Sequence, residues 1–150
     1  MNQIPVPKNE PVLNYAPGSK EKIELKKVLA ELKSTQLDIK MTINGQKVAS
    51  DDRRRIHPPH ELSHTLGYYY KGSAKEVQAA IDAALTAKEG WEKMDWRDRA
   101  AIFLKAADLI AGRYRARTNA MTMLGQSKNI YQAEIDAVCE FCDFLRFNVA

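Results

Sequence analysis

The pattern of apolar and polar positions along the chain predicts a series of helices. In several stretches, apolar residues recur three or four positions apart among charged ones, which places them on one face of a helix. Ser73 and Glu76 form a capping box and Asp95 is a favourable N-cap, so two helix starts are marked by residue chemistry. Gly125 is expected to close another helix. The expected helical spans are 19–37, 73–91, 95–112, 113–124 and 130 onward.

Between the first two helices the pattern changes to alternation, which predicts strands. Residues 39–43 alternate, Asn44-Gly45 is typical of a type I′ hairpin turn, and residues 46–48 form the return strand. A further strand is expected over residues 66–71, which include three consecutive tyrosines. Residues 1–18 are rich in proline and predict an extended arm along a surface. The expected fold class is α/β, with residues 1–38 as an arm followed by an amphipathic helix.

Composition places the chain among ordinary soluble domains and argues against a nucleic-acid partner. It has 150 residues, of which 45% are hydrophobic and 28% charged, enough for one core. The net charge is +4, but the basic residues are dispersed among 19 acids. The one basic run, Arg53 to Arg55, follows Asp51 and Asp52, which favours a solvated turn over a phosphate site.

Targeting signals are not found in the sequence. No stretch approaches the ~18 apolar residues of a membrane-spanning helix. The first residues lack the apolar core of a signal peptide, and prolines interrupt any amphipathic transit pattern. We therefore expect a cytoplasmic protein without a membrane partner.

The last stretch, residues 132–150, is the most informative, because it predicts a buried helix that is apolar on two faces and carries a carboxylate. On a regular helical wheel Glu140 lies within about 60° of one apolar set, while a second set lies opposite. The first set is Ala133, Ala137, Phe144 and Phe147, and the second is Ile135, Val138, Cys142 and Leu145. A charge in such surroundings needs a partner, so Glu140 either forms an internal salt bridge or awaits a cationic ligand. No residue with a typical capping role is expected to close this helix, which indicates a piece of a larger protein.

Cys139 and Cys142 form a C-x-x-C pair, for which packing is the favoured interpretation. Zinc would need further ligands at suitable spacing, and the histidines lie far upstream. A redox pair would sit at a helix N-terminus, whereas this pair is expected in the middle of a helix. Glycine-rich nucleotide-binding motifs, a nucleophile elbow and metal-ligand clusters are also missing from the sequence.

Several segments together carry a resemblance to a known family. They are TING at 42–45, Ile56-x-Pro58, SAKEV at 73–77 before an alanine-rich helix, and DRAAIFLKAAD at 98–108. A second group is NEPVL at 9–13, QAEIDA at 132–137 and DF-x-RFN at 143–148. The first group resembles the N-terminal portion of the aldehyde dehydrogenase superfamily. Within it, the second group resembles the 1-pyrroline-5-carboxylate dehydrogenases, over nearly the whole chain.

The resemblance implies an enzyme that oxidises L-glutamate γ-semialdehyde to L-glutamate with NAD⁺ in proline catabolism. It implies a Rossmann-type cofactor domain, of which residues 39–150 would be the incomplete N-terminal part, and a homo-oligomer when full length. In the family, a cysteine thiolate attacks the aldehyde, amides hold the oxyanion, hydride passes to NAD⁺, and a glutamate activates water. Those groups are expected beyond Ala150, so no catalytic, cofactor-binding or metal-binding residue is expected within 1–150. A eukaryotic member would be expected in the mitochondrial matrix.

One residue of the family's site can be carried to this sequence. The family has a glutamate on this helix that faces the α-ammonium of the substrate, and counting along QAEIDA places it at Glu140. The resemblance therefore implies that Glu140 binds substrate, with Phe144 as a neighbouring wall. Neither Cys139 nor Cys142 falls at the family's nucleophile position. The alternative is a free-standing helical interaction module that docks through its first helix and has no catalytic activity.

Overall fold

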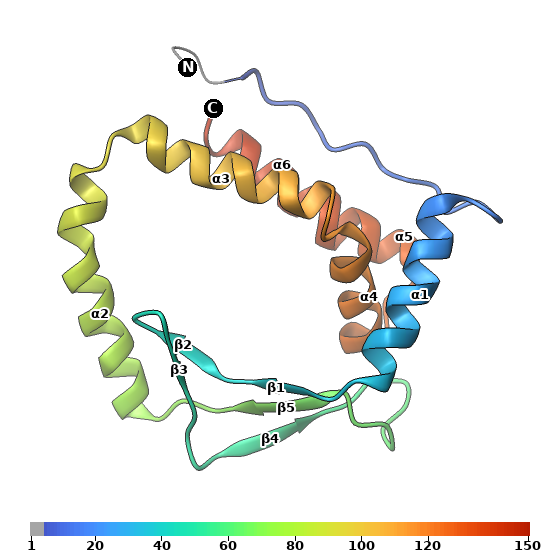
Figure 1. The fold of residues 1–150 in the computed structure, drawn as a ribbon, viewed down its shortest axis with the longest axis horizontal. Coiled ribbons are helices and arrows are strands. Elements are labelled where there is room, and N and C mark those ends of the chain that lie inside the picture. The colour runs from blue at the N-terminus through green and yellow to red at the C-terminus, as the bar shows by residue number, and fades with distance from the viewer. Residues whose placement is uncertain (1–4) are drawn as a thin grey trace.

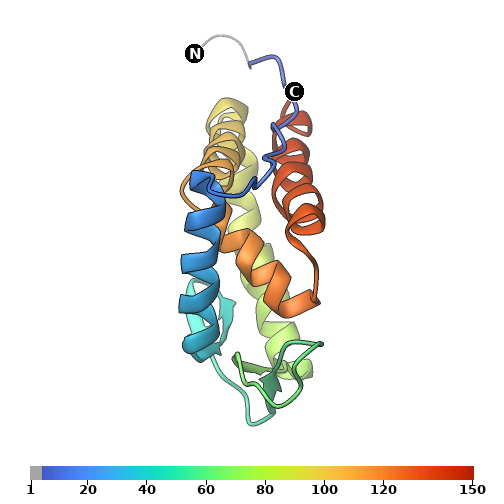
Figure 2. The same ribbon diagram turned by 90° about the vertical axis from the view of Figure 1, so that its right-hand side faces the viewer.

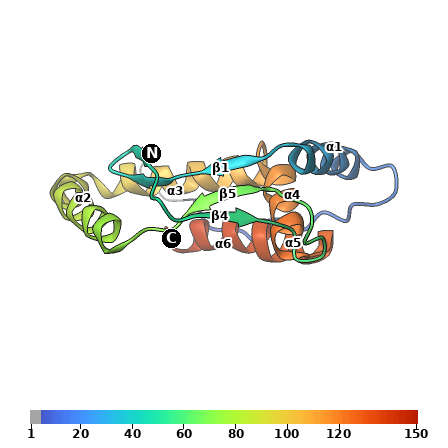
Figure 3. The same cartoon turned by 90° about the horizontal axis from the view of Figure 1, so that it is seen from below.

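The computed structural model describes residues 5–150, whose helices and strands follow an open ring (Figure 1). An extended arm leads into α1 (Lys20–Ser34), short strands make up one side of the ring, and helices make up the others. Views from the side and from below show that the ring is thin compared with its width (Figure 2, Figure 3). The mixture of strands and helices confirms the α/β prediction. None of the helices in the described part is both long and apolar enough to cross a membrane.

Helix α1 is the predicted amphipathic helix, and its partner surface is α4 (Arg115–Gln126). Leu25 and Leu32 lie two turns apart on one face and are each 4% exposed. They pack in one cluster with Ala120 and Leu124 of α4 and with Tyr15 of the arm. This cluster is the main apolar core, and it fastens the end of the arm to the helices.

The hairpin predicted from Asn44-Gly45 is confirmed. Strands β2 (Met41–Ile43) and β3 (Gln46–Val48) pair antiparallel, with Ile43 opposite Gln46. Asn44 and Gly45 have φ values of 48° and 73°, the two left-handed conformations that a type I′ turn requires. Ile39, expected in the same strand, belongs instead to β1 (Leu37–Ile39), which pairs parallel with β5 (Gly67–Tyr70).

The basic run is a strand, so its interpretation as a solvated turn is wrong. Strand β4 (Arg53–Ile56) pairs antiparallel with β5, which gives a three-stranded sheet of order β1-β5-β4. The guanidinium of Arg53 lies over the ring of Tyr68, 3.7 Å from its centroid. Arg54 pairs with Asp52, which lowers the pKa of that carboxyl through the hydrogen bond. Stacking and local ion pairs thus let a positively charged segment occupy the edge of a sheet.

Gly67 is required where β5 meets β1. Its φ is +154°, and a Cβ at this position would lie 2.2 Å from the carbonyl oxygen of Leu37. We expect Gly67→Ala to destabilise the protein by about 3 kcal/mol, because backbone strain and a backbone clash combine. Gly90→Ala is the matched control, since a Cβ there meets nothing within 4 Å and alanine favours a helix. Thermal unfolding of both variants measures the effect, and a wild-type melting temperature for Gly67→Ala would contradict it.

Two long helices complete the ring, and the apolar face of the first is largely uncovered in the described chain. Helix α2 (Ala74–Lys93) starts at the predicted Ser73 capping box, and α3 (Trp96–Ala111) starts at Asp95. None of the residues of α2 is buried, and Ile81 and Leu85 on its apolar face are 47% and 64% exposed. An apolar helix face left in water is typical of a surface that another part of a protein covers.

The later helices end differently from the prediction. Gly125 lies inside α4, which ends at Gln126, and Ser127 takes the left-handed conformation that closes the helix, with φ of 57°. The last helical segment ends at Phe147 and does have a cap. Asn148 donates both its backbone N–H and its side-chain amide to the carbonyl of Phe144, the latter at 2.7 Å, so the expectation of an uncapped end is wrong.

Candidate functional site

The helical segment that carries Glu140 contains a π-helical turn. It consists of α5 (Ile130–Ala133), the π-turn η1 (Glu134–Cys139) and α6 (Glu140–Phe147). The backbone N–H of Glu140 donates to the carbonyl of Ile135, five residues earlier instead of four. A π-turn accommodates one extra residue. The residues after it are therefore rotated about the helix axis by about 100° from the positions that a regular helix would give them.

This rotation corrects the two faces predicted from a regular wheel. Ala133, expected beside Glu140, is fully buried, while Ile135, expected opposite, is 49% exposed. Phe144 and Phe147 follow Glu140 without interruption and are 58% and 48% exposed, so the burial expected for this face is not found within the described chain. The face of the helix that presents Glu140 therefore also carries Ile135, Phe144 and Phe147.

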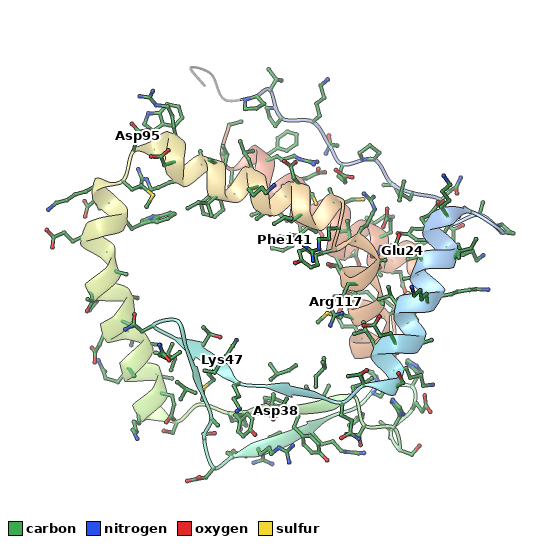
Figure 4. The ribbon with its side chains drawn as sticks, viewed as in Figure 1. Glu24, Asp38, Lys47, Asp95, Arg117 and Phe141 are labelled. Carbon is green, nitrogen blue, oxygen red and sulfur yellow. The ribbon has the colours of Figure 1, made fainter. Side chains whose placement is uncertain are left out.

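Glu140 lines a groove between this helix and the N-terminal arm. The groove has a volume of about 600 Å³. It is lined by Asn9, Val12, Ile135, Asp136, Cys139, Glu140, Asp143, Phe144 and Phe147. Aromatic and aliphatic walls with carboxylates among them suit a ligand that has a cationic group on a short carbon chain. Glu140 also borders a second, smaller groove towards α4, beside Phe141, which points to the inner side of the ring (Figure 4).

The Glu140 carboxylate has no hydrogen-bond or ion-pair partner among residues 5–150, and the residue is exposed. The internal salt bridge considered for it is therefore not formed within the described chain. An exposed carboxylate in an apolar groove is available for a cation. This arrangement is compatible with the ligand role that the resemblance implies, which stays a prediction.

The internal salt bridge belongs to Glu134, which the sequence did not single out. Its carboxylate is completely buried, and the guanidinium of Arg115 pairs with it. Asn119 and the Tyr15 hydroxyl donate to its second oxygen at 2.7 and 2.8 Å, and the backbone N–H of Leu13 donates to its first at 2.9 Å. With so many donors, the charge of Glu134 is well satisfied in the interior.

These contacts shift the ionisation of the groups that share them. Burial alone would raise the pKa of Glu134, but hydrogen bonds from Arg115, Leu13 and Asn119 outweigh it and lower the pKa. Burial opposes the charge of Arg115, yet its bonds to Glu134 and Glu10 raise its pKa further. Burial and the Glu134 carboxylate together raise the pKa of Tyr15. Glu134 and Arg115 are therefore both charged, and Tyr15 is a neutral donor.

A second carboxylate, from Glu10, ties the arm to two helices. One oxygen lies 2.5 Å from Arg115 Nη1 of α4, and the other lies 2.7 Å from Arg146 Nη1 of α6. The backbone N–H of Glu10 and the side-chain amide of Asn9 donate to the two oxygens of Asp143, at 2.6 and 2.7 Å. The arm thus forms one wall of the groove and is fastened to the helix that carries Glu140.

The two cysteines are buried, as expected of packing residues. Cys142 lies against the carbonyl oxygen of Ala107, 3.5 Å from its Sγ, and Cys139 lies 3.6 Å from Arg115 Nη2. Burial and the Glu134 carboxylate raise the pKa of Cys139 to about 11, and burial raises that of Cys142. Both are thiols near neutral pH, whereas the reactive form of cysteine is the thiolate.

Comparison with known proteins shows the family of this chain. The chain belongs to the aldehyde dehydrogenase family, whose model matches residues 47–150. Its sequence is 49% identical over 149 residues to the Δ1-pyrroline-5-carboxylate dehydrogenase of Agaricus bisporus, covering 99% of this chain and 27% of that one. A probable Δ1-pyrroline-5-carboxylate dehydrogenase of Schizosaccharomyces pombe is 43% identical, covering 97% of this chain and 27% of that one.

Among solved structures, the Δ-pyrroline-5-carboxylate dehydrogenase of Mycobacterium tuberculosis bound with NAD is similar, with a TM-score of 0.97 and 46% identity. The match covers 100% of this chain and 28% of that one. The predicted fold, part of an aldehyde dehydrogenase fold, is therefore confirmed. The chain spans about a quarter of the length of the curated relatives it matches.

Proposed function

We propose that the complete protein containing this chain oxidises L-glutamate γ-semialdehyde, the open form of 1-pyrroline-5-carboxylate, to L-glutamate with NAD⁺ in proline catabolism. The observation that carries the proposal is the similarity of almost the entire chain to enzymes named for this activity. The test is NADH formation by the complete protein supplied with the semialdehyde. A complete protein that folds and forms no NADH would overturn the proposal. Family membership does not favour the alternative of a free-standing interaction module.

The reacting groups of this chemistry lie outside residues 1–150. The family's thiolate nucleophile, its water-activating glutamate and its cofactor cradle have no counterpart in this sequence, and Cys139 and Cys142 are buried thiols. No residue of this chain is assigned to NAD⁺, whose nicotinamide accepts the hydride when bound. The contribution of this chain is therefore to bind and orient the substrate.

Glu140 is the residue proposed to bind the substrate. Its carboxylate has no partner among residues 5–150 and borders an apolar groove, so it is free to accept hydrogen bonds from the α-ammonium of the semialdehyde. The ring of Phe144, one turn further on, lines the same groove and would pack against the carbon chain of the substrate. Such a contact holds the substrate in one orientation while its aldehyde end faces groups from the remainder of the protein.

Domain organisation, assembly and location are proposed on the same basis. Residues 1–38 form an arm and helix, and residues 39–150 are proposed as the N-terminal part of the NAD-binding domain. The unpartnered face of α2 would be covered by the remainder of the protein or by another subunit of a homo-oligomer. A cytoplasmic location is proposed, or the mitochondrial matrix for a eukaryotic source, since relatives from Mus musculus and Dictyostelium discoideum are named mitochondrial.

We expect residues 1–150 alone to form no NADH with glutamate γ-semialdehyde and not to bind NAD⁺ tightly. The reason is chemical: the chain has no exposed thiolate to attack the aldehyde and no glycine-rich loop for the pyrophosphate. Absorbance assays for NADH and titration of NAD⁺ by calorimetry measure the two properties. NADH production by the purified chain would contradict the assignment of the reacting groups to another part of the protein.

A further inference from the structure

Among residues 5–150, the short polar contacts of α6 with other elements are with the N-terminal arm. Arg146 contacts the Glu10 carboxylate at 2.7 Å, and Asp143 accepts hydrogen bonds from Asn9 and from the Glu10 backbone at 2.7 and 2.6 Å. Helix α6 also packs against α3, where Cys142 and Ala107 are both fully buried, but its polar contacts there are longer. Cys142 lies 3.5 Å from a backbone carbonyl there, and Arg146 lies 4.0 Å from Asp108.

Because of the π-turn, these contacts affect the direction in which the Glu140 side chain points. The buried Glu134 fixes the first residue of the turn, whereas Glu140 begins α6 directly after it. In the π-turn, backbone hydrogen bonds join residues five apart instead of four, so the rotation of α6 about its axis differs from that of a regular helix. Contacts of α6 with its surroundings then help to hold that rotation.

Glu10 is placed to hold that rotation. Its side chain is only 10% exposed and joins Arg115 of α4, itself bonded to Glu134, with Arg146 of α6. The chain of contacts from Glu134 through Arg115 and Glu10 to Arg146 thus bridges the π-turn from one side to the other. Charged groups shielded from water in this way are restricted in geometry, because a displaced partner leaves a buried charge unpaired.

We propose that Glu10 is a positioning residue for substrate binding: through Arg146 and Asp143 it holds α6 in the rotation that presents Glu140 to the groove. The proposal rests on the proposed function of Glu140 and extends it to the N-terminal arm. Glu10 does not touch the substrate. Its side chain acts on the geometry of α6, and its backbone and Asn9 complete the opposite wall of the groove.

The test is a double-mutant cycle in the complete enzyme with Glu10→Gln, Glu140→Gln and the double variant. Two substrates are compared: glutamate γ-semialdehyde and glutarate semialdehyde, which differs only in lacking the α-ammonium. We expect Glu10→Gln to lower kcat/KM for the first substrate roughly tenfold, mainly through KM, and to change the second little. In the Glu140→Gln background, Glu10→Gln should cause no further loss, because the contact that it positions is already gone.

Controls separate positioning from general instability. Glu31→Gln removes an exposed carboxylate that lies 3.6 Å from Arg117 in an ion pair, and it should change kcat/KM for neither substrate. Asn9→Ala removes one bond to Asp143, keeps the Glu10 ion pairs and should give a smaller loss with the same selectivity. Melting curves of every variant accompany the kinetics.

The outcomes distinguish this proposal from the one on which it rests. If Glu140→Gln causes no selective loss, the substrate role of Glu140 fails and the positioning role fails with it. If the loss in Glu140→Gln is selective, but Glu10→Gln lowers kcat/KM equally for both substrates or for neither, only the positioning role is overturned. Additive losses in the double variant would also overturn it, since they mean that Glu10 acts independently of Glu140.

Discussion

Glu140→Gln in the complete enzyme is expected to lower kcat/KM for glutamate γ-semialdehyde roughly ten- to a hundredfold. The substitution keeps the size of the side chain and removes its charge, so a charge-assisted bond to the α-ammonium is lost, about 1.5–3 kcal/mol. The loss should be selective. Glutarate semialdehyde lacks the ammonium and never made the bond, so its oxidation should change little. Steady-state kinetics with both aldehydes measure the effect.

Stability should be almost unchanged in this variant. Glu140 is exposed and has no partner among residues 5–150, so Glu140→Gln breaks no contact that the described structure contains. A structural role would instead lower the melting temperature and slow both aldehydes alike. An equal loss on the two substrates, together with a lower melting temperature, would show that Glu140 does not bind the ammonium.

The largest effect on stability is expected for Glu134→Ala, about 3–5 kcal/mol. The substitution leaves the guanidinium of Arg115 with Glu10 as its remaining carboxylate. It removes the acceptor of the Tyr15 hydroxyl and of the Leu13 N–H, and one of the two acceptors of the Asn119 amide. Thermal unfolding of the complete protein measures the loss. Glu31→Ala is the control, because its exposed ion pair is worth at most ~1 kcal/mol.

The pH dependence gives a second measure of the same cluster. Because the pKa of Glu134 is lowered in the folded protein, the unfolded chain binds its proton more readily. The stabilisation is present above the unfolded pKa, near 4.5, and is lost as the pH falls through the lower folded value. Glu134→Ala should lack this acid-dependent loss. A variant that melts like the wild type, with the same acid dependence, would contradict the assignment of the buried charge to Glu134.

The features that sequence predicted best were those encoded by neighbouring residues. Asn44-Gly45 specifies its turn because both residues tolerate a left-handed backbone, and Ser73 with Glu76 specifies a helix start by pairing with the backbone locally. Such contacts need no knowledge of the remainder of the fold. Arg53 to Arg55 were misassigned because the strand that they form depends on pairing with β5 and on stacking against Tyr68.

The site was only partly predictable, for two physical reasons. A helical wheel assumes 3.6 residues per turn throughout, so the π-turn between Glu134 and Cys139 exchanged the positions of Ala133 and Ile135. The signal available in the sequence was the spacing of two apolar residues, Ala133 and Val138, which are five positions apart, as a π-turn requires. Both are buried in the structure. The partners of Glu134 in the arm lie more than a hundred residues away, with sequence separations of 119 and 121, and no local pattern reveals such contacts.

Recognition of the substrate α-ammonium by Glu140 is tested most directly by one ratio in the complete enzyme with NAD⁺. It is kcat/KM for glutamate γ-semialdehyde divided by kcat/KM for glutarate semialdehyde, measured for the wild type and for Glu140→Gln. We expect the ratio to fall roughly tenfold or more in the variant, as the loss of a charge-assisted bond predicts. An unchanged ratio would contradict the role of Glu140.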